Sequence, residues 1–307
     1  MSGKAVAIFG LGAMGFGMAG ALLRAGLTTH GYDINDGAVA RFQAAGGAPG
    51  AIEEVAGALD AVVIVVVNAA QTASVLFGSG GGGDSGGGGI AGKLAPGTAV
   101  VACATVAPEA ARDMAARCAA LGLHYLDAPV SGGTIRAGKG ELSILASGSR
   151  SAFAKAGPAL DAMASQVFDL GDEVGAGSSM KAVNQMLVGI QIAAMAEAIT
   201  FGMTQGVKPE KFLEVIRQCA GTSWALESRA PHVIAGDYTP LSAVDIWPKD
   251  LGIVMDIARG AKFGAPLTAA ALQQYLAASG SGLGKEDDAA VAKVYARNAG
   301  LTLPGEA

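Results

Sequence analysis

The sequence predicts an α/β fold in which a doubly wound parallel sheet, residues 1–171, is followed by an all-helical domain, residues 172–307. Short apolar runs alternate with helical stretches in the first part, which is typical of strand-helix-strand units. After about residue 170 the strand signals end and helical periodicity continues alone. A length of 307 residues also suits two domains.

The first elements form one strand-helix-strand unit. An apolar run over residues 5–9 predicts a strand, residues 14–25 a helix, and residues 29–32 a second strand. A helix at 38–45 and the β-branched run AVVIVVV at 61–67 continue the pattern. Because that run is apolar at every position, we expect a strand buried on both faces, as in a parallel sheet.

Further strands are predicted at 100–103, 124–126 and 144–147. We place the domain boundary beside Asp172, where the period changes. Glycine and proline separate the helices that follow. These helices are predicted at residues 178–205, 209–219, 248–263, 266–279 and 287–298.

Composition excludes several function classes. The net charge is -5 and no basic run occurs, which argues against a nucleic-acid partner. Cys103, Cys118 and Cys219 lack the spacing of metal ligands and are typical of reduced thiols. No metal site is therefore expected. The N-terminus resembles neither a leader nor a cleavage site, which predicts a cytoplasmic protein.

Two segments allow either a purely structural or a functional interpretation. Residues 180–203 are apolar enough for a membrane span, but they include Lys181 and Glu197, which would be costly in a bilayer. We expect a buried helix inside an all-helical core. The glycine tract at 78–89 does not join a strand directly to a helix, so a surface insertion is favoured over a phosphate-binding loop.

A glycine loop follows the first strand and opens the first helix, the context required of a dinucleotide-binding turn of the Rossmann type. Its amides would face the pyrophosphate at the helix N-terminus. Asp33 ends the next strand, where its carboxylate would accept ribose hydroxyls and repel a 2′-phosphate, which favours NAD over NADP. The expected cofactor-binding residues in the loop are Gly10, Leu11, Gly12, Ala13, Met14 and Gly15.

Three later segments, together with this loop, resemble the β-hydroxyacid dehydrogenases. They are DAPVSGG at 127–133, continuing through Gly140, then GAGSSMKAVNQ at 175–185, and KDL at 249–251. The match covers essentially the whole chain in order. It implies an enzyme that oxidises a short hydroxy acid with a nicotinamide cofactor, as a homodimer or homotetramer.

Lys181 is the candidate general base. It lies near the start of an apolar helix, where desolvation and the helix dipole would both favour a neutral amine. The residues alone leave open a lysine whose charge reaches solvent at a helix end. The resemblance implies catalysis, because the family has its catalytic lysine at this place.

Asn184 lies three residues further on and would share a helix face with Lys181. The resemblance favours a catalytic role, in which it binds the substrate hydroxyl or orients the amine, over an ordinary buried amide. Gln185 stands where many relatives have asparagine, and its role is left open.

Ser131, Gly132 and Gly133 are expected in a loop after a strand, where bare amides and a hydroxyl would bind a substrate carboxylate. The alternative is a simple turn. Arg136 stands where many relatives have glycine. It would reach the substrate or face solvent, and the sequence does not decide between these.

Three further residues match cofactor-contact positions of the family: Asn68, Thr105 and Lys249. Asn68 and Thr105 each follow a strand and could equally be turn-forming residues. Lys249 is expected to begin a helix, and its alternative is an ion pair with Asp250 or another neighbour.

The family's substrates include 3-hydroxyisobutyrate, the tartronate semialdehyde and glycerate pair, and L-threonate. Asn184-Gln185 and the segment VDIWPKDL at 244–251 resemble the members that act on L-threonate, so the resemblance implies that substrate. The substrate loops carry no basic cluster for a phosphosugar acid. Imine reductases share the architecture but usually replace the lysine, and non-catalytic chromatin-binding relatives carry basic extensions, so both alternatives are disfavoured.

Overall fold

The computed structural model describes residues 4–78 and 88–306. The chain divides into two compact units, Met1–Lys181 and Ala182–Ala307. They meet inside the long helix α8 (Ala176–Thr204), later in the chain than the domain boundary predicted between residues 171 and 172, which stays a prediction. Most of the predicted glycine insertion at 78–89 lies outside the described residues.

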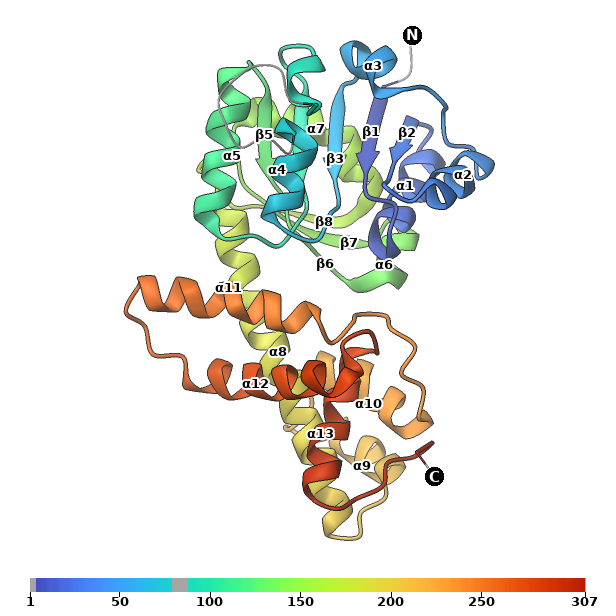
Figure 1. Cartoon of the computed structure of the whole chain (residues 1–307), viewed down its shortest axis with the longest axis vertical. Helices are drawn as coiled ribbons and strands as arrows, with labels where there is room; N and C mark the ends of the chain where they lie inside the picture. The colour runs from blue at the N-terminus through green and yellow to red at the C-terminus, as the bar shows by residue number, and fades with distance from the viewer. Residues whose placement is uncertain (1–3, 79–87, 307) are drawn as a thin grey trace. The chain divides into compact units, whose positions relative to one another are not determined.

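The first unit is built on a parallel sheet (Figure 1). Among the described residues its strand order is β2-β1-β3-β4-β5, with every neighbouring pair parallel. The predicted doubly wound α/β fold is thereby confirmed. Its strands are β1 (Ala5–Phe9), β2 (Thr28–Tyr32), β3 (Ala61–Ile64), β4 (Ala99–Ala102) and β5 (His124–Asp127).

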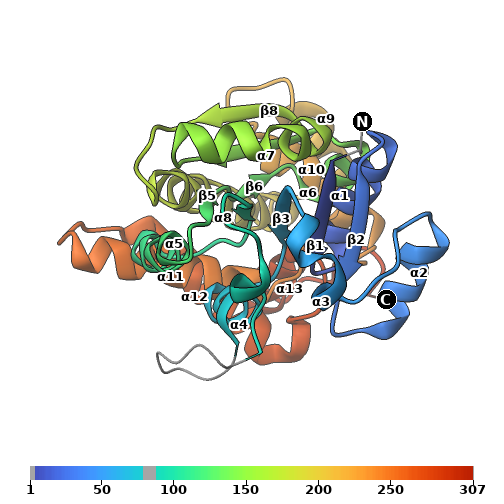
Figure 2. The ribbon, with the colours of Figure 1, turned by 90° about the horizontal axis from the view of Figure 1, so that it is seen from above.

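Side chains on the two faces of this sheet enter two different cores. Ile8, Val63 and Val101 face a core that includes residues of α1 (Ala13–Arg24) and α7 (Arg150–Met163). Their chain neighbours, such as Val62 and Val100, face α4 (Ala69–Phe77) and α5 (Pro108–Ala120) instead. Figure 2 shows α7 and α4 on opposite sides of the strands. Burial on both faces explains the continuous apolar runs in the sequence.

A second, smaller sheet completes the first unit. It has the order β6-β7-β8, with β6 (Val130–Ser131) antiparallel and β8 (Ala164–Asp169) parallel to β7 (Leu142–Ala146). The sequence predicted only β7. A two-residue strand gives no periodic signal, and β8 is largely exposed, so it lacks the apolar run of a buried strand. The remaining helices of the unit are α2 (Asp36–Ala44), α3 (Ile52–Val55) and α6 (Gly133–Lys139).

The second unit is helical, as predicted, and strand pairing among its described residues is limited to an isolated bridge between Ala243 and Asp287 (Figure 1). Helix α10 was not predicted, because it contains Pro231 and a proline usually interrupts or ends a helix. Its helices after α8 are α9 (Pro209–Ile216), α10 (Trp224–Ala235), α11 (Ile246–Gly260), α12 (Pro266–Ala278) and α13 (Val291–Asn298).

Helix α8 is long and apolar enough to cross a membrane by length and composition. One side of it enters the core of the second unit through Ile192, Met195 and Ile199, which are buried. The predicted burial holds for that side only, because Leu187 and Phe201 are 54% and 65% exposed. The expectation of a helix fully enclosed by the core is therefore wrong.

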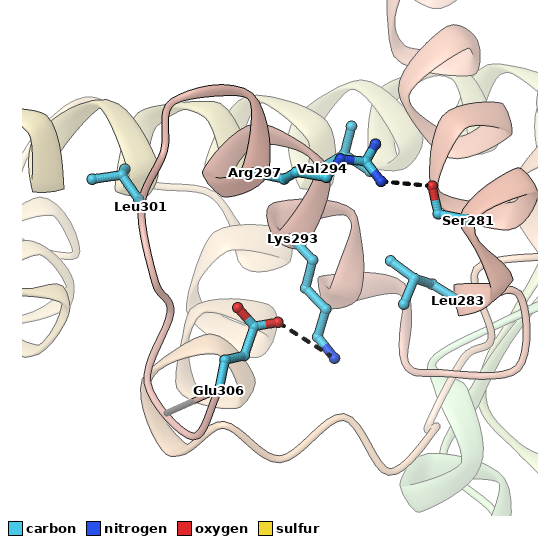
Figure 3. A pocket seen from close by; sticks show the side chains of 7 residues that line it. All are labelled: Ser281, Leu283, Lys293, Val294, Arg297, Leu301 and Glu306. Carbon is cyan, nitrogen blue, oxygen red and sulfur yellow. Dashed lines mark hydrogen bonds and ion pairs between the residues drawn. The ribbon is translucent and has the colours of Figure 1, made fainter.

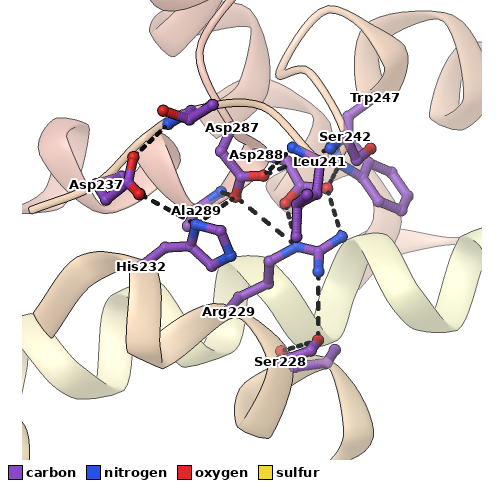
Figure 4. Close-up of polar contacts among 12 residues, drawn as sticks. Ser228, Arg229, His232, Asp237, Leu241, Ser242, Trp247, Asp287, Asp288 and Ala289 are labelled. Atoms are coloured by element: carbon purple, nitrogen blue, oxygen red, sulfur yellow. Dashed lines mark hydrogen bonds and ion pairs between the residues drawn. The ribbon is translucent and has the colours of Figure 1, made fainter. Parts of the chain in front are cut away.

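The core of the second unit also contains charged groups (Figure 4). The Arg229 guanidinium on α10 donates from Nε to Asp288 Oδ1 at 2.5 Å, and the Trp247 indole N–H donates to Asp288 Oδ2 at 3.0 Å. Burial raises the pKa of Asp288, against the opposing effect of Arg229. The neighbouring Asp287 accepts the backbone N–H of Leu241 at 2.9 Å. These contacts join α10, α11 and the segment before α13.

Candidate functional site

The glycine loop lies between β1 and α1, as predicted. Gly10 has φ +95° and donates its N–H to the Tyr32 carbonyl at 2.8 Å, so the chain turns sharply beside β2. A Cβ at Gly15 would lie 1.8 Å from the Gly10 carbonyl oxygen. Both glycines are therefore required by the close packing of the chain itself.

Gly12 differs from the other two. It is the N-cap of α1, with φ −69°, and no heavy atom lies within 4 Å of the place a Cβ would take. No contact inside the described chain requires glycine there. Open space at a helix N-terminus whose amides lack side-chain caps fits the phosphate of a dinucleotide.

Asp33 follows β2 and lies beside the glycine loop. Its Oδ2 accepts the Leu11 N–H at 2.6 Å, and its Oδ1 accepts the Asn35 N–H at 2.8 Å. These bonds fix the half-buried carboxylate at the edge of the loop, where a ribose diol would approach. The loop and this carboxylate together fit a nicotinamide dinucleotide.

Asn68 is the N-cap of α4, and its Oδ1 accepts the Gln71 N–H at 2.9 Å. This bond matches the turn-forming alternative for its carbonyl oxygen and leaves the side-chain amide N–H groups for other partners. Thr105 is half-buried in the segment between β4 and α5. Both residues follow the carboxyl ends of parallel strands, the edge at which ligands bind in such sheets.

Asp127 ends β5 and holds the beginning of α8. Its Oδ2 accepts the N–H groups of Gly175 at 3.1 Å and Ser178 at 2.8 Å. Its Oδ1 accepts the Ser178 hydroxyl at 2.7 Å. Burial raises the pKa of Asp127, although these hydrogen bonds oppose the shift. A buried carboxylate thus satisfies backbone donors that the first turn of a helix leaves unpaired.

Gly177 allows this close approach. A Cβ there would lie 2.5 Å from the Leu145 carbonyl oxygen and 2.7 Å from that of Asp127. The Gly177 N–H also donates to the Ser147 hydroxyl at 3.0 Å. Lys181 follows on the same helix and is only 7% exposed. The first turn of α8 is therefore fixed against the ends of β5 and β7 just before the candidate base.

Residues 131–133, predicted as a substrate-binding loop, differ from that prediction in their local structure. Ser131 lies in strand β6 and pairs with Ser143 of β7, so it is not a loop residue. Gly132 and Gly133, at φ +133° and +73°, form the turn into α6. Arg136, whose role the sequence left open, donates to the Ser165 hydroxyl of β8 at 3.2 Å.

Four polar residues of the second unit form one chain of contacts. The Asn184 side-chain N–H donates to Gln185 Oε1 at 2.8 Å, and Gln185 Nε2 donates to Asp250 Oδ2 at 2.5 Å. Lys249 Nζ lies 2.6 Å from Asp250 Oδ1. Lys249 stands in the first turn of α11, which begins at Ile246 rather than at the lysine.

The sequence predicted no role for Asp127 or Ser178, and Asp250 entered only as the alternative ion-pair partner of Lys249, a contact that the structure contains. Asp127 and Asp250 were visible as acids within the quoted motifs, and a buried acid in a motif is a signal to look for its partners. Their partners Ser178 and Gln185, however, lie far away in the sequence. Asp127 and Ser178 are 51 residues apart, and Gln185 and Asp250 are 65 apart.

A cavity of about 370 Å³ lies elsewhere, beside α13 (Figure 3). Its cations have partners within the second unit: Lys293 pairs with Glu286 at 2.7 Å, and Arg297 donates to the Ser281 hydroxyl at 2.9 Å. None of the predicted site residues lines it. Among the described residues, no group of three or more His, Cys, Asp or Glu is placed to hold a metal ion.

Comparison with known proteins gives two family matches. Residues 5–171 match the NAD binding domain of 6-phosphogluconate dehydrogenase, and residues 175–295 match the NAD-binding model of NADP-dependent 3-hydroxyisobutyrate dehydrogenase. The chain has an NAD(P)-binding domain on this evidence.

Individual proteins match over nearly the full length. L-threonate dehydrogenase from Cupriavidus necator is 48% identical over 303 residues, covering 98% of each chain. 2-(Hydroxymethyl)glutarate dehydrogenase from Eubacterium barkeri is 34% identical, covering 98% of this chain and 97% of its own. A crystal structure of 3-hydroxyisobutyrate dehydrogenase from Salmonella typhimurium is 46% identical, with a TM-score of 0.87, and covers 95% of this chain and 99% of that one.

Proposed function

We propose, because the chain belongs to the 3-hydroxyisobutyrate dehydrogenase-like family of NAD(P)-dependent hydroxyacid dehydrogenases, that it oxidises L-threonate at C2 to the 2-oxo acid. The observation that best supports this substrate is the 48% identity to an L-threonate dehydrogenase over 98% of both chains. The short motifs at 184–185 and 244–251 favour the same substrate.

In this proposal Lys181 is the general base. Bound NAD supplies the acceptor for the hydride that leaves C2. Lys181 Nζ accepts the proton of the C2 hydroxyl, so that a carbonyl forms as the C–H and O–H bonds break. Its burial and the fixed first turn of α8 support this role, because a base must be held within hydrogen-bond reach of the proton that it takes.

The other site residues bind and orient the reactants. Asn184 binds the reacting hydroxyl, and the backbone amides of Gly132 and Gly133 with the Ser131 hydroxyl bind the carboxylate. Asn68, Thr105 and Lys249 contact the cofactor. The turn at Gly132 and Gly133 supports the carboxylate assignment, since successive amides beside positive-φ residues can form a concave anion site.

We assign NAD rather than NADP as the preferred cofactor. The Asp33 carboxylate is fixed by the backbone N–H groups of Leu11 and Asn35. It would repel the 2′-phosphate of NADP, because both groups are negatively charged. An Asp33→Ser variant is expected to lower the ratio of kcat/KM for NAD over NADP by at least about tenfold. An unchanged ratio would remove Asp33 from the assignment.

The substrate test is a panel of hydroxy acids. L-threonate, 3-hydroxyisobutyrate and glycerate are each offered with NAD and with NADP, and the formation of reduced cofactor is followed. We expect the highest kcat/KM with L-threonate and NAD. The second candidate is 3-hydroxyisobutyrate, favoured by the 46% identity to the Salmonella protein. Turnover of 3-hydroxyisobutyrate without turnover of L-threonate would replace the first assignment by the second.

We further propose a homodimer or homotetramer. Large apolar side chains are exposed on α8 and α12, including Leu187, Phe201 and Leu267 at 54%, 65% and 68%. Exposed apolar surface of this kind is typical of interfaces, and a second copy of the chain is the expected occupant. Light scattering after size exclusion measures the mass, and Phe201→Glu should shift it toward the monomer. A wild-type monomer at micromolar concentration would contradict this proposal.

The expected compartment is the cytoplasm. Among the described residues, Cys103, Cys118 and Cys219 are free thiols, and burial raises the pKa of Cys103 and of Cys118 to about 12. Free thiols are typical of reducing compartments.

A further inference from the structure

We propose that Asp250 and Gln185 are positioning residues that hold Asn184 and Lys249 in one common arrangement. The inference rests on the proposed function, in which Asn184 faces the substrate and Lys249 the cofactor. Two branches of contacts meet at Asp250. In one, Lys249 Nζ lies 2.6 Å from the carboxylate, and in the other, Asn184 is linked to the carboxylate through the Gln185 amide.

Both positioning residues are buried. Asp250 is 2% exposed and Gln185 is 7% exposed. A buried carboxylate is costly unless it is paired, and a buried ion pair is seldom a net source of stability. Apolar side chains would fill the same volume at lower cost. A geometric role accounts for the presence of an acid at this place.

The direction of the hydrogen bonds follows from the chemistry of the carboxylate. An ionised carboxylate only accepts, so Gln185 must turn its Nε2 toward Asp250. Its Oε1 then faces Asn184 and accepts one N–H of that amide. The Asn184 carbonyl oxygen and its second N–H are thereby oriented for other partners. One carboxylate thus sets the rotation of two successive amides.

The packing of α8 on α11 maintains these distances. A Cβ at Gly189, one turn after Gln185, would lie 2.9 Å from the Leu251 side chain and 3.0 Å from Trp247. The Tyr275 hydroxyl donates to the Gly189 carbonyl at 2.9 Å. The two helices therefore approach closely beside the Gln185–Asp250 contact.

The two branches can be separated by mutation. Gln185→Leu breaks only the Asn184 branch, so it should lower kcat/KM for the hydroxy acid by roughly tenfold and leave the KM for NAD near the wild-type value. Asp250→Asn breaks both branches, because an asparagine can donate as well as accept and no longer pairs with Lys249. It should lower kcat/KM for the hydroxy acid and raise the KM for NAD.

A double mutant tests whether Asp250 acts through Asn184. In an Asn184→Ala background, Asp250→Asn should cause little further loss in kcat/KM for the hydroxy acid. Additive losses, or wild-type kinetics in both Gln185→Leu and Asp250→Asn, would overturn the inference. Asp256→Asn, which changes an exposed acid on the same helix, is the matched control and should leave both kinetic constants unchanged.

A spectroscopic readout separates this inference from the proposed function. With ¹⁵N-asparagine labelling, the side-chain amide resonance of Asn184, assigned by its loss in Asn184→Ala, should shift in Asp250→Asn and in Gln185→Leu. If the wild type oxidises no hydroxy acid but this resonance shifts, the proposed function fails and the positioning stands. A resonance unchanged in both variants contradicts the positioning, whatever the activity.

Discussion

The Ser178 hydroxyl donates to Asp127 Oδ1 at 2.7 Å, and the same residue's backbone N–H donates to Asp127 Oδ2 at 2.8 Å. One serine thus attaches the first turn of α8 to the end of β5 through both carboxylate oxygens. Lys181 lies three residues later on that helix. The position of the proposed base therefore depends on a contact outside the reacting groups.

Ser178→Ala should lower stability and turnover together. Loss of the hydroxyl leaves a buried carboxylate oxygen with one donor fewer, which costs about 1–3 kcal/mol. We expect kcat to fall by roughly tenfold through misplacement of Lys181. Urea unfolding and steady-state kinetics measure the two effects.

Ser149→Ala is the control for this variant. Ser149 caps α7 in the same unit, where its hydroxyl accepts the Ala152 N–H at 3.2 Å. Its loss should cost about 1 kcal/mol of stability with no change in kcat. If both serine variants left kcat at the wild-type value, the proposed dependence of Lys181 on the Asp127 contact would be refuted.

Gly12→Ala should affect cofactor binding without affecting the fold. The backbone at φ −69° accepts an L side chain, and no atom lies within 4 Å of the new methyl group. The unfolding midpoint should therefore change little, whereas the affinity for NAD, measured by calorimetric titration, should fall by at least about tenfold because the methyl takes the place of a phosphate.

Gly20→Ala on the same helix is the comparison, because its methyl would meet only the end of the Arg24 side chain, at 3.4 Å. It should bind NAD as the wild type does. Equal NAD affinities in Gly12→Ala and the wild type would contradict the placement of the pyrophosphate.

The fold could be predicted where the sequence carries a strong local signal. The glycine loop, β1, β2 and β4 lie within a residue or so of their predicted bounds. The run at 61–67 was predicted as one strand, but β3 ends at Ile64. The segment after β3 lies against the glycine loop, because a Cβ at Gly10 would be only 2.2 Å from the Val65 carbonyl oxygen. This contact joins residues 55 positions apart in the chain, and no local pattern in the run at 61–67 contains it.

The family resemblance is confirmed by the comparisons, and with it the type of enzyme. The contacts of the candidate site could be predicted only in part. Lys181 and Asn184 could be selected from a motif, and Asp250 could be named as a neighbour of Lys249. The pairing of Asp127 with Ser178 and of Asp250 with Gln185 could not be predicted. Asp127 and Asp250 make their contacts across 51 and 65 residues of chain, and such contacts depend on the packing of strand ends and helices.

Arg229→Met should be strongly destabilising. It leaves Asp287 and Asp288, both fully buried, without their guanidinium, and breaking a buried pair in this way typically costs about 3–5 kcal/mol. Arg259→Met, which removes an exposed pair with Asp256 on α11 in the same unit, should cost less than about 1 kcal/mol. Chemical denaturation compares the two. Similar losses in both variants would show that burial does not set the cost.

The Lys155–Asp60 pair should stabilise the first unit in a pH-dependent way. Lys155 Nζ lies 2.6 Å from Asp60 Oδ1, and this contact lowers the pKa of Asp60. A lowered folded-state pKa gives stability that is present above the unfolded pKa, near 4, and is lost as the pH falls through the folded value.

A double-mutant cycle of Lys155→Met and Asp60→Asn should therefore give a coupling free energy of at most about 1 kcal/mol at pH 7, because the pair is partly exposed. The coupling should shrink as the pH falls below about 4. Unfolding free energies of the four proteins at each pH supply the values. A coupling that grew at low pH would have the wrong sign for this pair.

The central claim is that Lys181 removes the hydroxyl proton of the hydroxy acid, and the most direct measurement is turnover of L-threonate with NAD by Lys181→Met. We expect kcat to fall by at least about 100-fold while the NAD dissociation constant stays near the wild-type value. Lys211→Met, at an exposed lysine on α9, should retain wild-type turnover. Wild-type kcat in a folded Lys181→Met protein that binds NAD would contradict the account.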